Sequence, residues 1–287
     1  MCWLVGDRGC REFTSDAMKL LFSEANPDYA HYTFPYAIWA IPESGENPPE
    51  IFASGFLPSS KFLDRFYLCR HIRVKLADYA ASSENRRILR KGAGISCRLI
   101  KRNDFDYSEE RRAFYKKYAD SKFGRDVMNF ERLDGLFSAP IISHVLEFSD
   151  ETNGKHVGDV TLYLEEPGMA YYYYSFYDLA YVSRNLGMYM MTAAVEFFAK
   201  RKVRHLYLGT CYSQQALYKS QFKGAEFFNG FRWSENLKEL KFLIQKDKTP
   251  RPEHLLELPG FEPFYPKGLK QISALSPFQL CSANNRD

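Results

Sequence analysis

Residues 183–187 place an arginine and a glycine at the start of an amphipathic segment, and this combination suits the binding of an anion. Arg184 supplies a guanidinium, and Gly187 allows close approach to the backbone. If a helix begins here, its N–H groups and the positive end of its dipole would hold a phosphate or a developing oxyanion. We therefore predict an anion site at Arg184 and Gly187, with a plain helix start as the alternative.

An aromatic strand precedes this turn and ends in a carboxylate. Residues 171–174 are all tyrosine, and side chains along a strand point alternately to opposite faces, so two of them should be core. The other two, Tyr174 among them, would line a groove for a base or an amine. Tyr177 and Asp178 at the strand end are candidates for proton transfer. A loop carboxylate without a catalytic role is the alternative for Asp178.

A second predicted helix carries Tyr218, Lys219 and Lys223. The two lysines are four residues apart, which places them one helical turn apart on the same face. They would clamp a carboxylate or a phosphate of a substrate. A solvated surface pair is the alternative interpretation.

The segment 82–91 concentrates arginine. Arg86, Arg87, Arg90 and Lys91 lie at positions i, i+1, i+4 and i+5, which form one continuous helical face without an intervening acid. Such a face would neutralise several phosphates of a nucleic acid. A solvated basic face is the alternative.

The elements that must position these residues follow from periodicity. Alternating or apolar runs predict strands over residues 34–41, 66–74, 141–148, 157–164, 169–177, 203–208 and 227–233. Helices are predicted from Ser108, through the repeat of Leu186, Met190, Ala194 and Phe198, and from Ser213 to Lys223. The order predicts an α+β fold with a mixed sheet flanked by helices. We divide the chain into an N-terminal α+β extension (1–125), a catalytic domain (126–245) and a tail (246–287).

Composition excludes several classes of protein. The net charge of the 287-residue chain is only +4, so a nucleic-acid partner must be argued locally. No apolar run reaches the ~20 residues that a membrane helix needs, and the N-terminus lacks the pattern of a signal peptide, so we expect a cytoplasmic protein without a membrane partner. The six cysteines are scattered without a CxxC pair, which predicts free thiols and no metal site.

The motifs together resemble a known family. The turn at Arg184 and Gly187 is similar to the acyl-CoA turn of GNAT acyltransferases, but Tyr189 stands at its last position and argues against ordinary CoA binding. The combined motifs resemble the arginyl-tRNA–protein transferases and the bacterial aspartate/glutamate leucyltransferases. The resemblance spans about residues 55–223 and is carried by Gly55–Ser60 with Phe66-Tyr67 and Arg73-Val74, Ser82–Lys91, Ser175–Asp178 with Ser183–Gly187, and Tyr207–Gly209 with Tyr218-Lys219 and Phe222-Lys223.

The resemblance implies a GNAT-like domain that transfers an amino acid, arginine or leucine, from aminoacyl-tRNA to the N-terminal residue of an acceptor protein and so marks it for degradation. It implies no cofactor beyond the charged tRNA. In this interpretation Asp178, Arg184 and Tyr177 are catalytic, and the acceptor or donor is bound by Lys219, Tyr218, Lys223, Gly187 and Tyr174. The basic face of Arg86, Arg87, Arg90 and Lys91 binds tRNA. The alternatives are an acyl-CoA-dependent acetyltransferase and a non-catalytic relative that binds tRNA or degrons, because the chain departs from the family pattern at 179–180 and 215–216.

Overall fold

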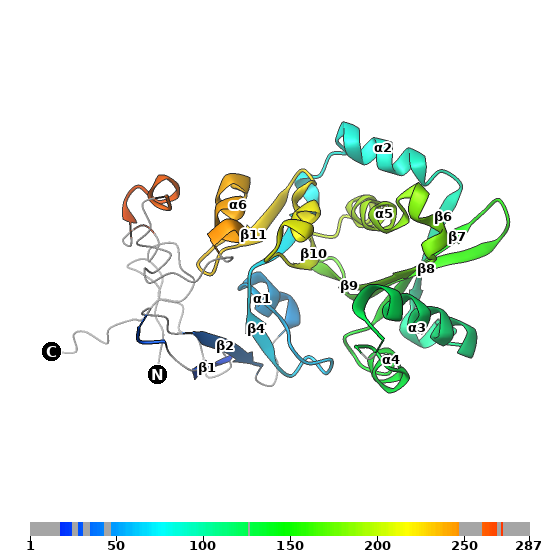
Figure 1. The fold of residues 1–287 in the computed structure, drawn as a ribbon, viewed down its shortest axis with the longest axis horizontal. Coiled ribbons are helices and arrows are strands. Elements are labelled where there is room, and N and C mark those ends of the chain that lie inside the picture. The colour runs from blue at the N-terminus through cyan, green and yellow to red at the C-terminus, as the bar shows by residue number, and fades with distance from the viewer. Residues whose placement is uncertain are drawn as a thin grey trace.

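The computed structural model describes residues 18–24, 28–30, 35–42, 47–125, 127–246, 260–268 and 271. Its main element is an eight-stranded mixed sheet of order β12-β11-β5-β10-β9-β8-β7-β6 (Figure 1). The strands are β5 (His71–Lys75), β6 (Ile95–Lys101), β7 (His144–Asp150), β8 (Lys155–Glu165), β9 (Met169–Tyr177), β10 (His205–Thr210), β11 (Ala225–Phe228) and β12 (Trp233–Ser234).

All neighbours in this sheet are antiparallel except β9 and β10, which run parallel. A parallel pair needs a crossover, and helix α5 (Leu186–Lys200) provides it. The predicted meander, helix and parallel strand are therefore present. The prediction of an α+β fold with a mixed sheet flanked by helices is confirmed.

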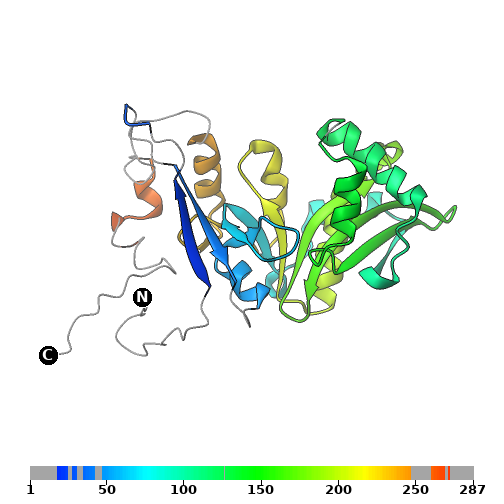
Figure 2. The same ribbon diagram turned by 90° about the horizontal axis from the view of Figure 1, so that it is seen from below.

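A smaller sheet stands beside the main one. It has the order β1-β2-β4-β3 and comprises β1 (Lys19–Glu24), β2 (Tyr36–Ile41), β3 (Phe56–Pro58) and β4 (Phe66–Leu68), with helix α1 (Pro48–Ala53) packed on it. Figure 2 shows this sheet, in blue, at one end of the molecule and the green helices at the other. The predicted strand 66–74 is thus two strands in different sheets. Because β5 and β6 belong to the main sheet, the predicted boundary at residue 125 passes through one structural unit.

Two helical layers cover the main sheet (Figure 1). On one face lie α5 and α2 (Ser83–Lys91), where Leu186, Met190, Ala194 and Phe198 are all buried as their spacing predicts. On the other face lie α3 (Glu109–Phe123) and α4 (Phe130–Phe137), whose apolar side chains join those of the small sheet in a second core. The predicted N-cap of α3 is present, because the Ser108 hydroxyl accepts from the Arg111 N–H.

The last described elements differ most from expectation. The segment predicted as a helix from Ser213 to Lys223 is a 3₁₀ helix, η4 (Gln214–Ser220), which ends before Lys223. The predicted strand 227–233 is interrupted between β11 and β12, and helix α6 (Leu237–Lys246) follows. Most of the predicted tail lies outside the described residues. No helix in the described part of the chain is both long and apolar enough to cross a bilayer.

Candidate functional site

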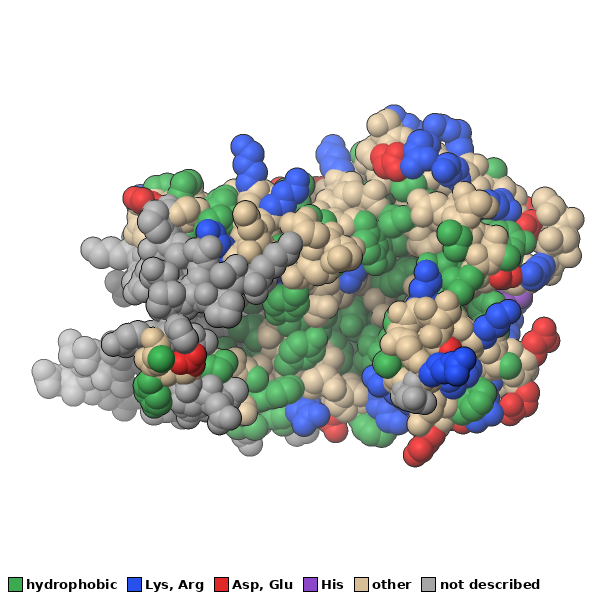
Figure 3. Space-filling model, viewed as in Figure 1, with side chains coloured by type: hydrophobic (Ala, Val, Ile, Leu, Met, Phe, Trp, Pro, Cys, Tyr) green, Lys and Arg blue, Asp and Glu red, His purple; other side chains and the backbone are tan. Residues whose placement is uncertain are grey.

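The parallel strands β9 and β10 separate after a short contact. Only Met169, Ala170 and Tyr171 of β9 pair with β10. Each strand then contains a β-bulge: the β8–β9 register skips Tyr173, and the β10–β5 register skips Leu208. Bulges bend strands and re-aim their side chains. Figure 3 shows this face of the molecule hollowed near its middle, with side chains of the hydrophobic class, which includes tyrosine, in the hollow. We call the opening between the two strands the split.

The bulge in β9 is held by a side chain of the neighbouring strand. The Thr161 hydroxyl accepts from the Tyr174 N–H at 3.0 Å and donates to the Tyr174 carbonyl at 3.3 Å. Of the four consecutive tyrosines, Tyr171 and Tyr172 are buried and Tyr173 and Tyr174 are half-buried. Burial therefore changes once along the run, after Tyr172, and does not alternate as predicted, because the bulge at Tyr173 shifts the register.

Four tyrosines, which we call the tyrosine cluster, gather at the split: Tyr118 of α3, Tyr172 and Tyr177 of β9, and Tyr218 of η4. The rings of Tyr118 and Tyr177 have centroids 4.7 Å apart. Burial raises the pKa of Tyr118, and the hydroxyl of Tyr177 and the nearby Tyr172 and Tyr218 raise it further. Tyr172 is 5% exposed and Tyr218 is 43% exposed. The cluster therefore leads from the protein interior to solvent.

Lys219 places a positive charge beside this cluster. Its Nζ donates to the carbonyl of Thr210 at 2.9 Å, and burial lowers its pKa. The nearby Cys211 is fully buried and burial raises its thiol pKa, so it stays neutral and is no counter-ion. No carboxylate in the described ranges forms an ion pair with Lys219. Because a buried charge is costly without an opposite charge, this ammonium favours an anionic ligand in the split.

Asp178, predicted as catalytic, lies at the end of β9. Its carboxylate accepts from the Ala180 N–H at 2.9 Å and pairs with Lys155 Nζ at 2.7 Å. Burial alone would raise the pKa of Asp178, but Lys155 and the Ala180 N–H outweigh it and lower the pKa. Asp178 is thus an ionised carboxylate next to Tyr177, and it caps the backbone N–H of Ala180.

The predicted anion turn is arranged differently from expectation. Arg184 pairs with Asp150 at 3.0 Å and donates to the carbonyl of Ala93 at 2.6 Å, so its guanidinium is engaged in structural contacts. A Cβ at Gly187 would lie 2.9 Å from the Tyr177 hydroxyl, which shows that the Tyr177 ring covers the first turn of α5. The geometry does not bring Arg184 and Gly187 together around an open anion site.

Tyr189 does not obstruct this turn either. Its ring is buried against Gly92 and Phe148, and its hydroxyl donates to the carbonyl of Ile95 at 2.5 Å. The prediction that the bulk of Tyr189 at the turn excludes CoA is therefore wrong. The turn is instead unsuited to CoA because Arg184 is held by Asp150 and Gly187 is covered by Tyr177.

The predicted basic helix is present as α2. A capping box of Ser82 and Asn85 fixes its start, and all four predicted tRNA-binding side chains are exposed: Arg86, Arg87, Arg90 and Lys91. Figure 3 shows their class of side chain gathered over α2. Glu84 forms a bidentate pair with Arg87, which the sequence argument overlooked. Lys223 is exposed and lies beyond η4, so it is not on one helix with Lys219.

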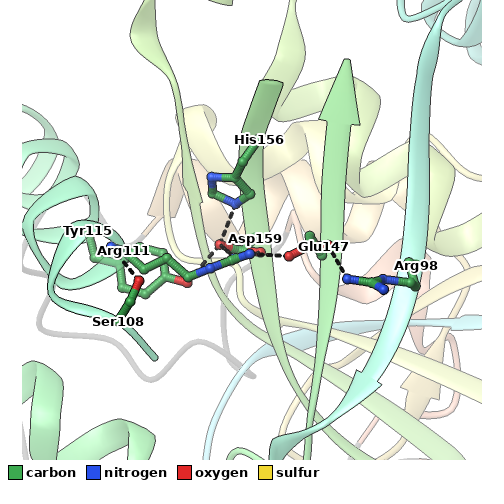
Figure 4. Close-up of polar contacts among 7 residues, drawn as sticks. All are labelled: Arg98, Ser108, Arg111, Tyr115, Glu147, His156 and Asp159. Atoms are coloured by element: carbon green, nitrogen blue, oxygen red, sulfur yellow. Dashed lines mark hydrogen bonds and ion pairs between the residues drawn. The ribbon is translucent and has the colours of Figure 1, made fainter. Parts of the chain in front are cut away.

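A buried polar network beneath α3 was not predicted (Figure 4). Asp159, fully buried, accepts from Arg111 at 3.1 Å, Tyr115 at 2.7 Å and His156 at 2.7 Å, and Arg111 also pairs with Glu147. The sequence indicates this network only through Glu147 and Asp159, two acids that stand among apolar residues of β7 and β8. The network fixes α3 on β7 and β8 and thereby positions Tyr118, one turn beyond Tyr115.

In the part of the chain that the structure describes, no cluster of three His, Cys, Asp or Glu side chains could hold a metal ion.

Known proteins resemble this chain over part of its length, although no family model matches it. It is 26% identical over 179 residues to an aspartate/glutamate leucyltransferase of Cereibacter sphaeroides, covering 58% of this chain and 62% of that protein. Proteins of the same name in Ruegeria pomeroyi (27% over 169 residues; 58% and 61% covered) and Chromobacterium violaceum (23% over 186 residues; 63% and 74% covered) are also similar. The chain thus spans less than two thirds of the first of these relatives. The resemblance to the bacterial leucyltransferases is confirmed.

Solved structures show weaker likeness. The C-terminal domain of a putative lysylphosphatidylglycerol synthetase from Agrobacterium fabrum matches with a TM-score of 0.41 and 11% identity, covering 63% of this chain and 64% of that one. A GCN5-related N-acetyltransferase from Sphaerobacter thermophilus matches with a TM-score of 0.35 and 15% identity, covering 74% and 59%.

Proposed function

We propose that this protein transfers an amino acid from aminoacyl-tRNA to the α-amine of an acceptor whose N-terminal residue is acidic. The observation that carries the proposal is Lys219, a half-buried ammonium at the split that forms no ion pair with a described carboxylate. An aspartate or glutamate side chain of an acceptor would supply the missing charge. The relatives' name, aspartate/glutamate leucyltransferase, supports the same acceptor class.

The split offers a backbone surface for an extended acceptor terminus. Beyond Tyr171 and Tyr207 no described hydrogen bond joins β9 to β10. Their facing N–H and C=O groups can therefore bond to a peptide that enters between them, in the way that a strand is added to a sheet edge. An acidic first side chain would then lie near Lys219.

The chemistry requires positioning rather than a further cofactor, because the aminoacyl ester is already activated. The acceptor amine attacks the ester carbonyl, a C–N bond forms, and the C–O bond to the tRNA ribose breaks. One proton passes from the attacking amine to the departing ribose oxygen. We assign this transfer to Tyr177, assisted by Tyr118 and Tyr218, since these hydroxyls extend from the interior to solvent.

The donor in this proposal is leucine rather than arginine. The side chains around Lys219 and Tyr218 include the thiol of Cys211 and the neighbouring Leu217 of η4, which is packed on the core. An arginyl side chain would need a carboxylate as its partner. Among the described residues, no carboxylate interacts with Tyr218 or Lys219. The tRNA phosphates would be held by Arg86, Arg90 and Lys91.

Transfer of labelled amino acids from a charged tRNA pool to peptides that begin with Asp, Glu, Asn or Ala tests the proposal. We expect labelled leucine on the Asp and Glu peptides at much higher rates than on the Asn and Ala peptides. Salt-dependent tRNA binding without any transfer would instead indicate a non-catalytic relative. Marking for degradation is the final part of the proposal, and a shortened half-life of a reporter with an acidic N-terminus in cells that contain the protein would support it.

A further inference from the structure

The upper edge of the molecule in Figure 1 carries exposed cations from separate elements. Helices α2 and α6 lie towards its two ends, and η4 lies between them; Figure 3 shows Lys and Arg side chains projecting along this edge. We call the following residues the basic edge: Arg86, Arg90 and Lys91 of α2, Lys223 after η4, and Lys238 and Lys241 of α6. All are exposed.

Helix α6 presents only positive charge to solvent. Lys238 and Lys241 are exposed one turn apart, whereas Glu239 is fully buried. The Glu239 carboxylate accepts from Ser234 at 2.7 Å and from Asn229 at 2.8 Å. The one acid of this helix is therefore buried and hydrogen-bonded, so it does not pair with the exposed lysines.

The cations of the basic edge also differ from those elsewhere. On α3, Arg112 pairs with Asp134 and Lys116 pairs with Asp120. No residue of the basic edge forms an ion pair with any carboxylate that the structure describes. Two exposed acids of this part of the chain, Asp78 and Glu235, both pair with Lys75. A row of unpaired cations on separate elements suits a long polyanion.

We propose that the basic edge binds the phosphate backbone of a duplex arm of the donor tRNA. This inference rests on the proposed function and extends its tRNA contact from α2 to α6, which lies beyond the motifs of residues 55–223 that carry the resemblance to the leucyltransferases. A membrane surface is the less favoured partner because it needs apolar side chains beside the cations. Among the exposed large apolar residues of the described chain, only Leu237 lies on α2 or α6.

Binding of uncharged tRNA at several salt concentrations tests the inference. Affinity for tRNA falls as salt rises, and each lost phosphate contact makes the slope of log affinity against log salt shallower by about 1. K238Q/K241Q should therefore make this slope shallower by about 2. The control K101Q/K122Q removes two exposed lysines of β6 and α3 and should leave the slope unchanged. All four side chains are exposed, so circular dichroism should show both variants folded.

An unchanged slope for K238Q/K241Q, or an equal change in the control, would overturn the inference. So would a loss of binding to vesicles of phosphatidylserine with unaltered tRNA binding. Its failure is separable from that of the proposed function. Normal leucyl transfer with an unchanged slope refutes the basic edge alone, whereas a shallower slope without any transfer refutes the transferase alone.

Discussion

Replacement of Lys219 by methionine is the sharpest test of how the acceptor is recognised. Methionine keeps the length of the side chain but removes its charge, so an acceptor aspartate in the split would lose its counter-ion. Removing one partner of a buried charge pair costs about 2–5 kcal/mol. Lys219 is only partly buried, so we expect the lower part of this range. At about 1.4 kcal/mol per tenfold, kcat/KM for Asp-initiated peptides should fall by about 30- to 150-fold.

The matched substrate is a peptide that begins with asparagine, which offers a neutral hydrogen-bonding group of the same shape. For this peptide, K219M should remove only one hydrogen bond, which is worth about 0.5–1.5 kcal/mol. Its kcat/KM should therefore fall by about 2- to 10-fold. Steady-state transfer assays with both peptides, with K101M as the control variant, would measure the two effects. If K219M slows both peptides by the same factor, Lys219 does not read the acidic side chain and the reasoning fails.

The stability of K219M has a predicted sign. Burial lowers the pKa of Lys219, so the unfolded chain holds this proton more tightly than the folded protein does. Removing the group should therefore leave the melting temperature at neutral pH unchanged or higher. A large decrease would mean that the loss of activity reflects misfolding.

Further predictions concern the tyrosine cluster and the buried polar groups. Tyr177→Phe keeps the ring over Gly187 but removes the hydroxyl, and single-turnover transfer should slow by about 100-fold or more if that hydroxyl moves the proton; an unchanged rate would exclude this role. Arg111→Met leaves the carboxylate of Asp159 without its cation and should lower the free energy of unfolding in urea by about 3 kcal/mol. Burial lowers the pKa of His71 to about 3, so the unfolded chain alone takes up a proton between about pH 6.5 and about pH 3. Stability should fall with acidification through this window, and His71→Phe should lose less in the same urea titrations.

Strong local patterns made the central elements predictable. The strand 169–177 and the buried stripe of α5 follow from periodicity within a few turns of chain. The segment 66–74 reads as one strand because its first half is apolar and Ile72 and Val74 of its second half alternate with polar residues. The first half pairs with the nearby β3 and with β2, whereas the second half joins the main sheet through β10 and β11, which are distant in sequence.

The site was predictable in its residue types more than in its geometry. Tyr218 and Lys219 lie at the split, and their role in binding a substrate stays a prediction. Arg184 does not face it, because Asp150 and the Ala93 carbonyl determine its direction and neither is near in sequence. Tyr118 enters the site only through the packing of α3. No local pattern reports such contacts.

The position of β5 in the main sheet has a consequence for biosynthesis. Its two neighbours, β10 and β11, are both far later in the chain. While the protein is being translated, β5 therefore leaves the ribosome with both edges open and has no partner until β10 and β11 have emerged. An unpaired strand invites intermolecular pairing, so the nascent chain is exposed to such pairing at β5 for as long as β10 and β11 have not emerged.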